Sequence, residues 1–138
     1  MIGRYAPPLA LMALIWFLSA QPDLKSGLDS DLDLVLRKLA HMTEFGLLLV
    51  LWWRAAGPRA AVVITLAWAA VDEWHQTWVE GRNGAVSDWL IDAAGAAVAA
   101  ALMAWWLRCR RAGAARGRRA GPAGPSSPTR RRGRTGPT

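Results

Sequence analysis

Apolar residues gather in long segments along the chain, over about residues 5–20, 34–53, 60–78 and 87–107. None of these segments shows the alternation of apolar and polar positions that is typical of a half-buried strand. Helices of these lengths suit a hydrocarbon core of roughly 30 Å at about 1.5 Å rise per residue. Because lipid admits only helices and closed barrels, the pattern predicts an all-α integral membrane four-helix bundle, a domain over residues 1–111.

Composition separates this body from the C-terminal end. Ten of the 17 basic residues lie between Arg108 and Arg134, so the body up to Leu107 has seven basic and ten acidic residues. Residues 112–138 are rich in Gly, Pro, Ala, Ser and Arg, which predicts a disordered basic tail. Because no aromatic residue interleaves its arginines, we expect contact with anionic membrane lipids and no specific nucleic acid.

Other features support a membrane location. The nine tryptophans gather mostly near the ends of the apolar segments, as in the aromatic belts of bilayer proteins. The alternative, a soluble helical bundle with a Trp-rich core, would still have to bury the acidic residues. The first segment resembles a signal peptide, but the bulky Leu18 occupies a position where cleavage needs a small residue, which favours an uncleaved helix. The lone Cys109 excludes an intrachain disulfide.

The charges of the connecting segments predict the orientation. The connection between the second and third apolar segments contains Arg54 and Arg59 and no acidic residue, and the tail is strongly basic. The connection before the second segment is acidic instead. The positive-inside rule therefore predicts a multi-pass protein of a bacterial cytoplasmic membrane with both termini in the cytoplasm.

Ionisable residues interrupt three of the apolar segments, where they are costly and by default mark a functional site. In the predicted orientation they all lie in the outer half of the bilayer. Many share helix faces at three- to four-residue spacing: Asp72, His75 and Gln76 lie on one face, and Glu73 points about 100° away from Asp72. We therefore predict one polar pocket that opens outward and has its floor near Glu44. The ionisable residues are Lys38, His41, Glu44, Asp72, Glu73, His75, Asp88 and Asp92, and the polar, uncharged Gln76 lies among them.

The residue types suggest roles in this pocket. Histidines beside carboxylates form acid–base pairs, so the candidate catalytic residues are His41, Glu44, Asp72 and His75. The candidate ligand-binding residues are Lys38, Glu73, Gln76, Arg82, Asp88 and Asp92, with Arg82 suited to a phosphate or carboxylate. The chain contains no His-Glu-x-x-His motif, and we expect no bound metal or cofactor. The alternative is a salt-bridged network that only fixes helix register.

The order and spacing of these motifs resemble the VanZ-like family of small membrane proteins over roughly residues 5–107. Two positions depart from the family pattern: Phe45 stands where a tyrosine is usual, and Asp92 where an asparagine is frequent. The resemblance implies a multi-helix membrane domain, linked in some members to resistance to the glycopeptide teicoplanin. The motifs are Ser19-Ala20-Gln21-Pro22, Lys38-x-x-His41-x-x-Glu44-Phe45-x-x-Leu48, Asp72-Glu73-x-His75-Gln76, Gly81-Arg82, and Asp88 with Asp92 and Gly95.

Together these features predict a pocket that binds or modifies an anionic cell-envelope component, such as a lipid head group or a lipid-linked cell-wall precursor. The resemblance implies that such a protein would affect glycopeptide susceptibility. The residues do not decide whether it is an enzyme. The alternatives are a hydrolase or transferase acting on a lipid-linked substrate, a proton-coupled transporter, and a scaffold without catalysis. The ligand's identity and the oligomeric state stay open.

Overall fold

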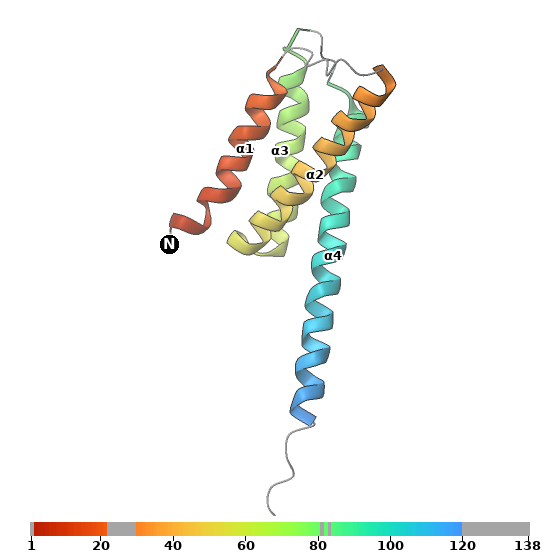
Figure 1. Ribbon diagram of the computed structural model, residues 1–138. Helices are drawn as coiled ribbons and strands as arrows, with labels where there is room; N and C mark the ends of the chain where they lie inside the picture. Colours follow the sequence, from red (N-terminus) through yellow and green to blue (C-terminus); the bar gives the residue numbers. More distant parts are fainter. Residues whose placement is uncertain (1, 22–29, 81, 83, 120–138) are drawn as a thin grey trace, which may run out of the picture. The chain divides into compact units, whose positions relative to one another are not determined.

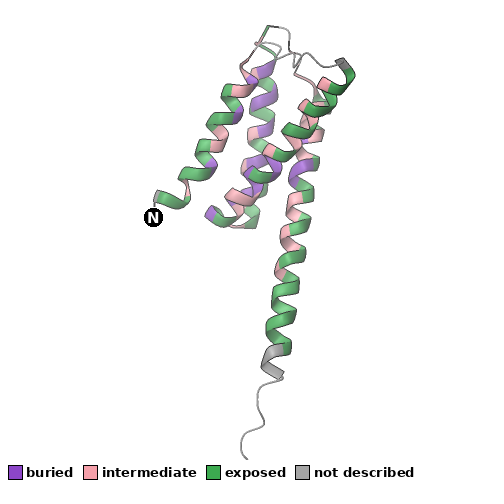
Figure 2. Cartoon of the chain, viewed as in Figure 1, coloured by how far each residue is buried: buried purple, intermediate pink, exposed green. Residues whose placement is uncertain are grey.

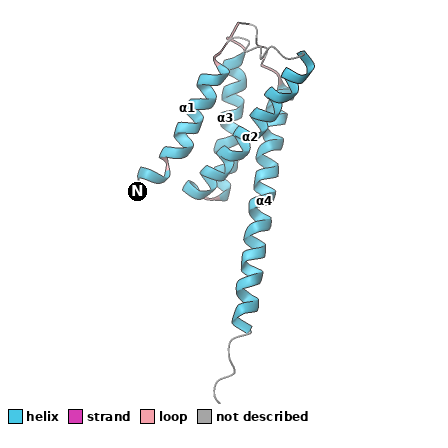
Figure 3. Cartoon of the chain, viewed as in Figure 1, coloured by secondary structure: helices cyan, strands magenta, loops and turns pink. Residues whose placement is uncertain are grey.

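The computed structural model describes residues 2–21, 30–80, 82 and 84–119, and this described part consists of helices joined by turns and loops, with no strand (Figures 1 and 3). The fold is therefore all-α, as predicted. The elements are a short 3-10 helix η1 (Ile2–Arg4) and the α-helices α1 (Ala6–Ser19), α2 (Ser30–Ala56), α3 (Pro58–Gln76) and α4 (Val86–Arg119).

Proline and glycine mark the starts of two helices. Pro7 lies in the first turn of α1 and Pro58 begins α3, positions where the missing N–H would have no helical partner anyway. Gly57 separates α2 from α3 with a φ of 88°, a conformation that residues with a Cβ rarely adopt. The sharp reversal at Gly57 places α2 and α3 beside each other in opposite directions (Figure 1).

The apolar core lies between the helices and contains both small and large side chains. Phe45 and Leu48 of α2 are fully buried, and they pack with Ile15 of α1, Ala69 of α3 and Ala96 of α4. Figure 2 shows the buried positions on the inward faces of the helices and exposed positions on their outward faces. The same core continues through Leu49, Trp52, Ala55 and Ala61.

Helices α2 and α4 approach each other most closely at a pair of glycines. A Cβ on Gly95 would overlap the carbonyl oxygen of Met42, and a Cβ on Gly46 would lie 3.2 Å from the carbonyl oxygen of Gly95. Only glycine at position 95 allows the two backbones to come this near. The absence of a side chain at Gly95 thus allows close helix packing.

Two helix ends differ from the prediction. Helix α2 begins at Ser30, earlier than expected, because Asp31 and Asp33 favour a helix N-terminus and Asp33 pairs with Arg37 one turn later at 3.0 Å. Helix α4 continues to Arg119, so the expected disordered tail is wrong for residues 112–119. These residues are mostly alanine and arginine, which favour helix, and the first proline after them is Pro122.

The chain divides after Trp106 into two units. The bundle belongs to the first unit, residues 1–106, and of the second unit the structure describes residues 107–119. The remainder of the expected tail, residues 120–138, lies outside the described residues.

Among the described helices, α4 has a stretch, Val86–Arg116, that is long and apolar enough to cross a membrane by itself. Helix α1 is apolar but shorter than a full span. Polar and charged residues lower the hydropathy of α2 and α3, and those that were predicted to form the pocket are among them.

Candidate functional site

A cavity of about 240 Å³ opens where α2 begins, α3 ends and α4 begins. Seven of the ten predicted site residues line it, and the structure therefore brings most of the predicted residues together. Glu44, Asp72 and His75 are the three predicted residues that do not line it. The lining residues are Leu34, Arg37, Lys38, His41, Glu73, Gln76, Arg82, Asp88, Ile91 and Asp92.

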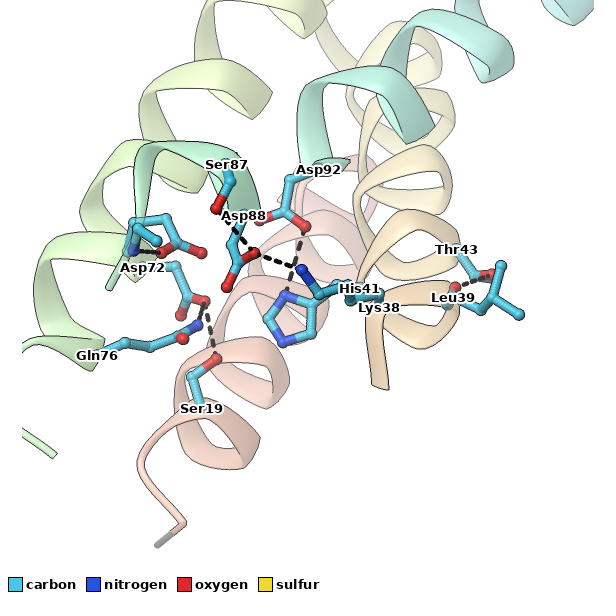
Figure 4. A network of polar contacts seen from close by, with 12 residues as sticks. Ser19, Lys38, Leu39, His41, Thr43, Asp72, Gln76, Ser87, Asp88 and Asp92 are labelled. Carbon is cyan, nitrogen blue, oxygen red and sulfur yellow. Dashed lines mark hydrogen bonds and ion pairs between the residues drawn. The ribbon is translucent and has the colours of Figure 1, made fainter. Parts of the chain in front are cut away.

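An ion pair between α2 and α4 lies at the edge of this cavity. Lys38 Nζ donates to Asp88 Oδ1 at 2.9 Å, and both side chains are 36% exposed (Figure 4). An ion pair this open to solvent contributes little to stability. It places a cation and an anion side by side at the edge of the cavity.

A histidine–carboxylate pair lies deeper in the same cavity. His41 Nδ1 of α2 approaches Asp92 Oδ1 of α4 at 3.4 Å, and Asp92 is only 1% exposed. A carboxylate beside Nδ1 orients an imidazole ring and leaves Nε2 for another partner. Below His41 lies the fully buried Phe45, with ring centroids 6.3 Å apart. Glu44, the expected floor of the pocket, is partly buried on the same helix and does not line the cavity.

A second network of polar contacts lies behind the cavity wall, between α1 and α3. Asp72 is fully buried, and its Oδ2 accepts hydrogen bonds from Ser19 Oγ at 2.8 Å and from Gln76 Nε2 at 2.9 Å (Figure 4). Gln76 also lines the cavity and thus connects the two groups of polar residues. Such a pairing satisfies both donors inside the bundle, where an unpaired polar group would be costly.

Glu73 points in a different direction from its neighbour Asp72, as the helical phase predicted. Its Oε2 accepts a hydrogen bond from the Ala85 N–H at 3.0 Å, just before α4 begins. A Cβ on Gly84 would overlap the Glu73 carbonyl oxygen, so glycine is needed where this connection passes over the end of α3. Glu73 thereby holds the start of α4 against the end of α3 while it lines the cavity.

His75 lies outside the cavity, on the face of α3 that meets α1. Its ring stacks on Trp16 with the centroids 3.7 Å apart and the planes 11° from parallel. Asp72, His75 and Gln76 share a face, as predicted, but this face meets α1. His75 therefore does not line the cavity that His41 lines.

Two residues that take part in these contacts were not among the predicted site residues. Arg37 lines the cavity, and its position directly before Lys38 was the available signal. Ser19 belongs to a motif that follows the first apolar segment, yet nothing in its sequence context indicated a bond to Asp72, 53 residues away.

The described site keeps unused hydrogen-bonding capacity. One oxygen each of Asp72, Glu73 and Asp92 is buried without a hydrogen-bond partner in the described part of the chain. Spare acceptors of this kind suit a ligand that brings hydroxyl or amino donors. No three His, Cys, Asp or Glu side chains among the described residues converge closely enough to hold a metal ion.

A family model described as VanZ/LLP1 matches residues 7–108. This segment holds every residue that lines the cavity, together with Ser19 and Asp72 behind it. The family predicted from the sequence motifs is thereby confirmed. Neither a curated protein nor a solved structure matches the chain significantly.

Proposed function

We propose that this chain, which belongs to the VanZ/LLP1 family, is a multi-pass membrane protein whose polar cavity binds an anionic cell-envelope component. The observation that carries the proposal is the inverted distribution of side chains. Asp72 and Asp92 are buried, whereas Phe17, Val63 and Leu102 are 61%, 68% and 59% exposed. Exposed apolar faces on all four α-helices, around an interior that holds buried acids as well as the apolar core, suit lipid surroundings and would aggregate in water.

The charges at the two ends of the bundle support one orientation. Arg4, Arg54 and Arg59 lie at the start of α1 and around the α2–α3 junction, the end where Figure 1 places the N-terminus. The cavity lies at the opposite end of α2 and α3. In a bacterial cytoplasmic membrane the positive-inside rule then places both termini in the cytoplasm and the cavity on the outer side.

The cavity residues suit a ligand that has both an anionic group and hydrogen-bond donors. Arg37, Lys38 and Arg82 bring positive charge to the lining, where Arg37 also pairs with Asp33 and Lys38 with Asp88, and the guanidinium groups match the oxygens of a phosphate or carboxylate. Glu73 and Asp92 supply acceptors for hydroxyl or amino groups. A lipid head group or a lipid-linked cell-wall precursor has this combination. Sequestration of such a component by the protein would change glycopeptide susceptibility.

A second candidate function, a hydrolase or transferase on a lipid-linked substrate, is favoured by the His41–Asp92 pair. In that reaction His41 would take a proton from the attacking hydroxyl through Nε2, while Asp92 would hold the ring. Glu44 and Asp72 would influence the charge of the His41–Asp92 pair, and His75 would take part in the reaction only after a movement of α1. Turnover of a labelled lipid-linked substrate by purified protein, lost in His41→Gln, would favour this candidate over binding alone.

The binding proposal is tested by site variants in a bacterial strain whose teicoplanin tolerance depends on this protein. We expect His41→Gln and Asp92→Ala to lose tolerance while Asp31→Asn, an exposed acid of α2 outside the cavity, keeps it. Immunoblots of membrane fractions verify equal protein levels. Full tolerance in both cavity variants at normal levels would reject a role for the cavity, and protein found in the soluble fraction would reject the membrane location.

A further inference from the structure

An apolar groove of about 800 Å³ runs between α2 and α4, away from the polar cavity. It begins near Gly46, where the two helices touch, and its walls include Leu47 of α2 and Leu102 of α4. Figure 1 shows α2 and α4 separating below their crossing. Because both walls are large apolar side chains that are about half exposed, the groove is suited to a hydrocarbon chain.

A cation lies at the far end of this groove. Arg54 is eight residues beyond Gly46 in α2, roughly 12 Å along the helix, and it lines the groove together with Trp105 and Trp106. No acidic side chain lines the groove, since the acids of the described residues lie between Asp31 and Glu44 of α2, around the end of α3 and at the start of α4. Apolar walls that end at an arginine and two indole rings complement a phospholipid, whose chains are apolar and whose phosphate is anionic.

We propose that this groove is a binding site for one anionic phospholipid of the inner leaflet, with an acyl chain along Leu47 and Leu102 and the phosphate on Arg54. The site is separate from the polar cavity and does not depend on the ligand of that cavity. The bound lipid joins α2 to α4 below the Gly46–Gly95 contact. It therefore stabilises the bundle on the side of this contact where Arg54 lies.

The experiment uses the full chain in detergent, titrated with phosphatidylglycerol or with phosphatidylcholine and followed by native mass spectrometry. We expect one phosphatidylglycerol per chain, bound about tenfold more tightly than phosphatidylcholine. Arg54→Gln removes this preference and Arg54→Lys retains it. Arg59→Gln is the matched control, because Arg59 is an exposed arginine at the same end that does not line the groove.

A second variant tests the walls of the groove. Leu102→Trp adds volume at an exposed position that lines the groove, leaves the charge unchanged, and should weaken both lipids alike. Circular dichroism verifies that each variant keeps its helix content. Equal affinity for the two lipids, an equal loss in Arg54→Gln and Arg59→Gln, or unchanged binding in Leu102→Trp would overturn the proposal. The cavity variants His41→Gln and Asp92→Ala should leave the lipid preference intact.

Discussion

The contact between Gly95 and Met42 supports a stringent test of the α2–α4 packing. In Gly95→Ala the new Cβ would lie 2.8 Å from the Met42 Cα and would overlap the Met42 carbonyl oxygen. Carbon atoms in good contact are about 3.5–4.0 Å apart, so the two helices must separate by roughly 0.7 Å or more. The atoms in the way are backbone atoms of α2, which cannot move aside as a flexible side chain would.

The expected cost follows from this overlap. Overfilling a well-packed interface costs about 1–3 kcal/mol, and the higher helix propensity of alanine offsets about 0.8–1.0 kcal/mol of it. The matched control is Gly46→Ala on the facing helix, whose Cβ would meet the Gly95 oxygen at 3.2 Å and Ala99 Cβ at 3.5 Å. Both variants gain the same propensity, so their difference in stability isolates the overlap at Gly95.

The assay is thermal unfolding in detergent, followed by circular dichroism. We expect Gly95→Ala to melt several degrees below Gly46→Ala, since 1 kcal/mol corresponds to about 4–8 °C for a domain of this size. The same separation would lengthen the His41–Asp92 contact, because Met42 follows His41 and Gly95 lies about one turn after Asp92. Equal melting temperatures for the two variants would refute the close backbone contact between α2 and α4.

Two further predictions concern the polar contacts. Asp72→Ala leaves the donors of Ser19 and Gln76 unpaired and should destabilise the bundle by about 1–3 kcal/mol for each of them. Ser19→Ala removes one donor and should cost less. Denaturant titration in detergent measures both variants, and equal losses of stability would contradict the network. Lys38 and Asp88 are partly exposed, so a double-mutant cycle with Lys38→Met and Asp88→Asn should give a coupling below about 1 kcal/mol. A coupling well above this value would show that the pair is shielded from water.

The helices could be predicted from the sequence because their apolar runs are long and bounded by proline and glycine. Seven of the cavity's residues could be predicted as well, since a charge inside an apolar helix has few structural explanations. Local signals failed at the ends: the composition of the alanine- and arginine-rich residues 112–119 predicted a tail, although their helix propensity is high.

Contacts between distant segments could not be predicted in detail. Helical phase placed His75 beside Asp72, but it does not say which neighbouring helix that face meets, and the stack on Trp16 directs His75 to α1. The bond from Ser19 to Asp72 likewise depends on where α1 packs. Pairing of this kind is a property of the assembled bundle, and a periodic pattern in one helix carries no information about its partner.

The most direct test of a recess that faces away from the cytoplasm uses a membrane-impermeant maleimide on intact cells. The first protein is the double variant Asp88→Cys/Cys109→Ser, whose one cysteine lies at the cavity. The second is the unaltered chain, whose one cysteine is the exposed Cys109 beyond the apolar part of α4. We expect labelling at position 88 in intact cells and labelling of Cys109 only after the cells are lysed. Labelling of Cys109 in intact cells, with position 88 protected until lysis, would contradict an outward-facing cavity.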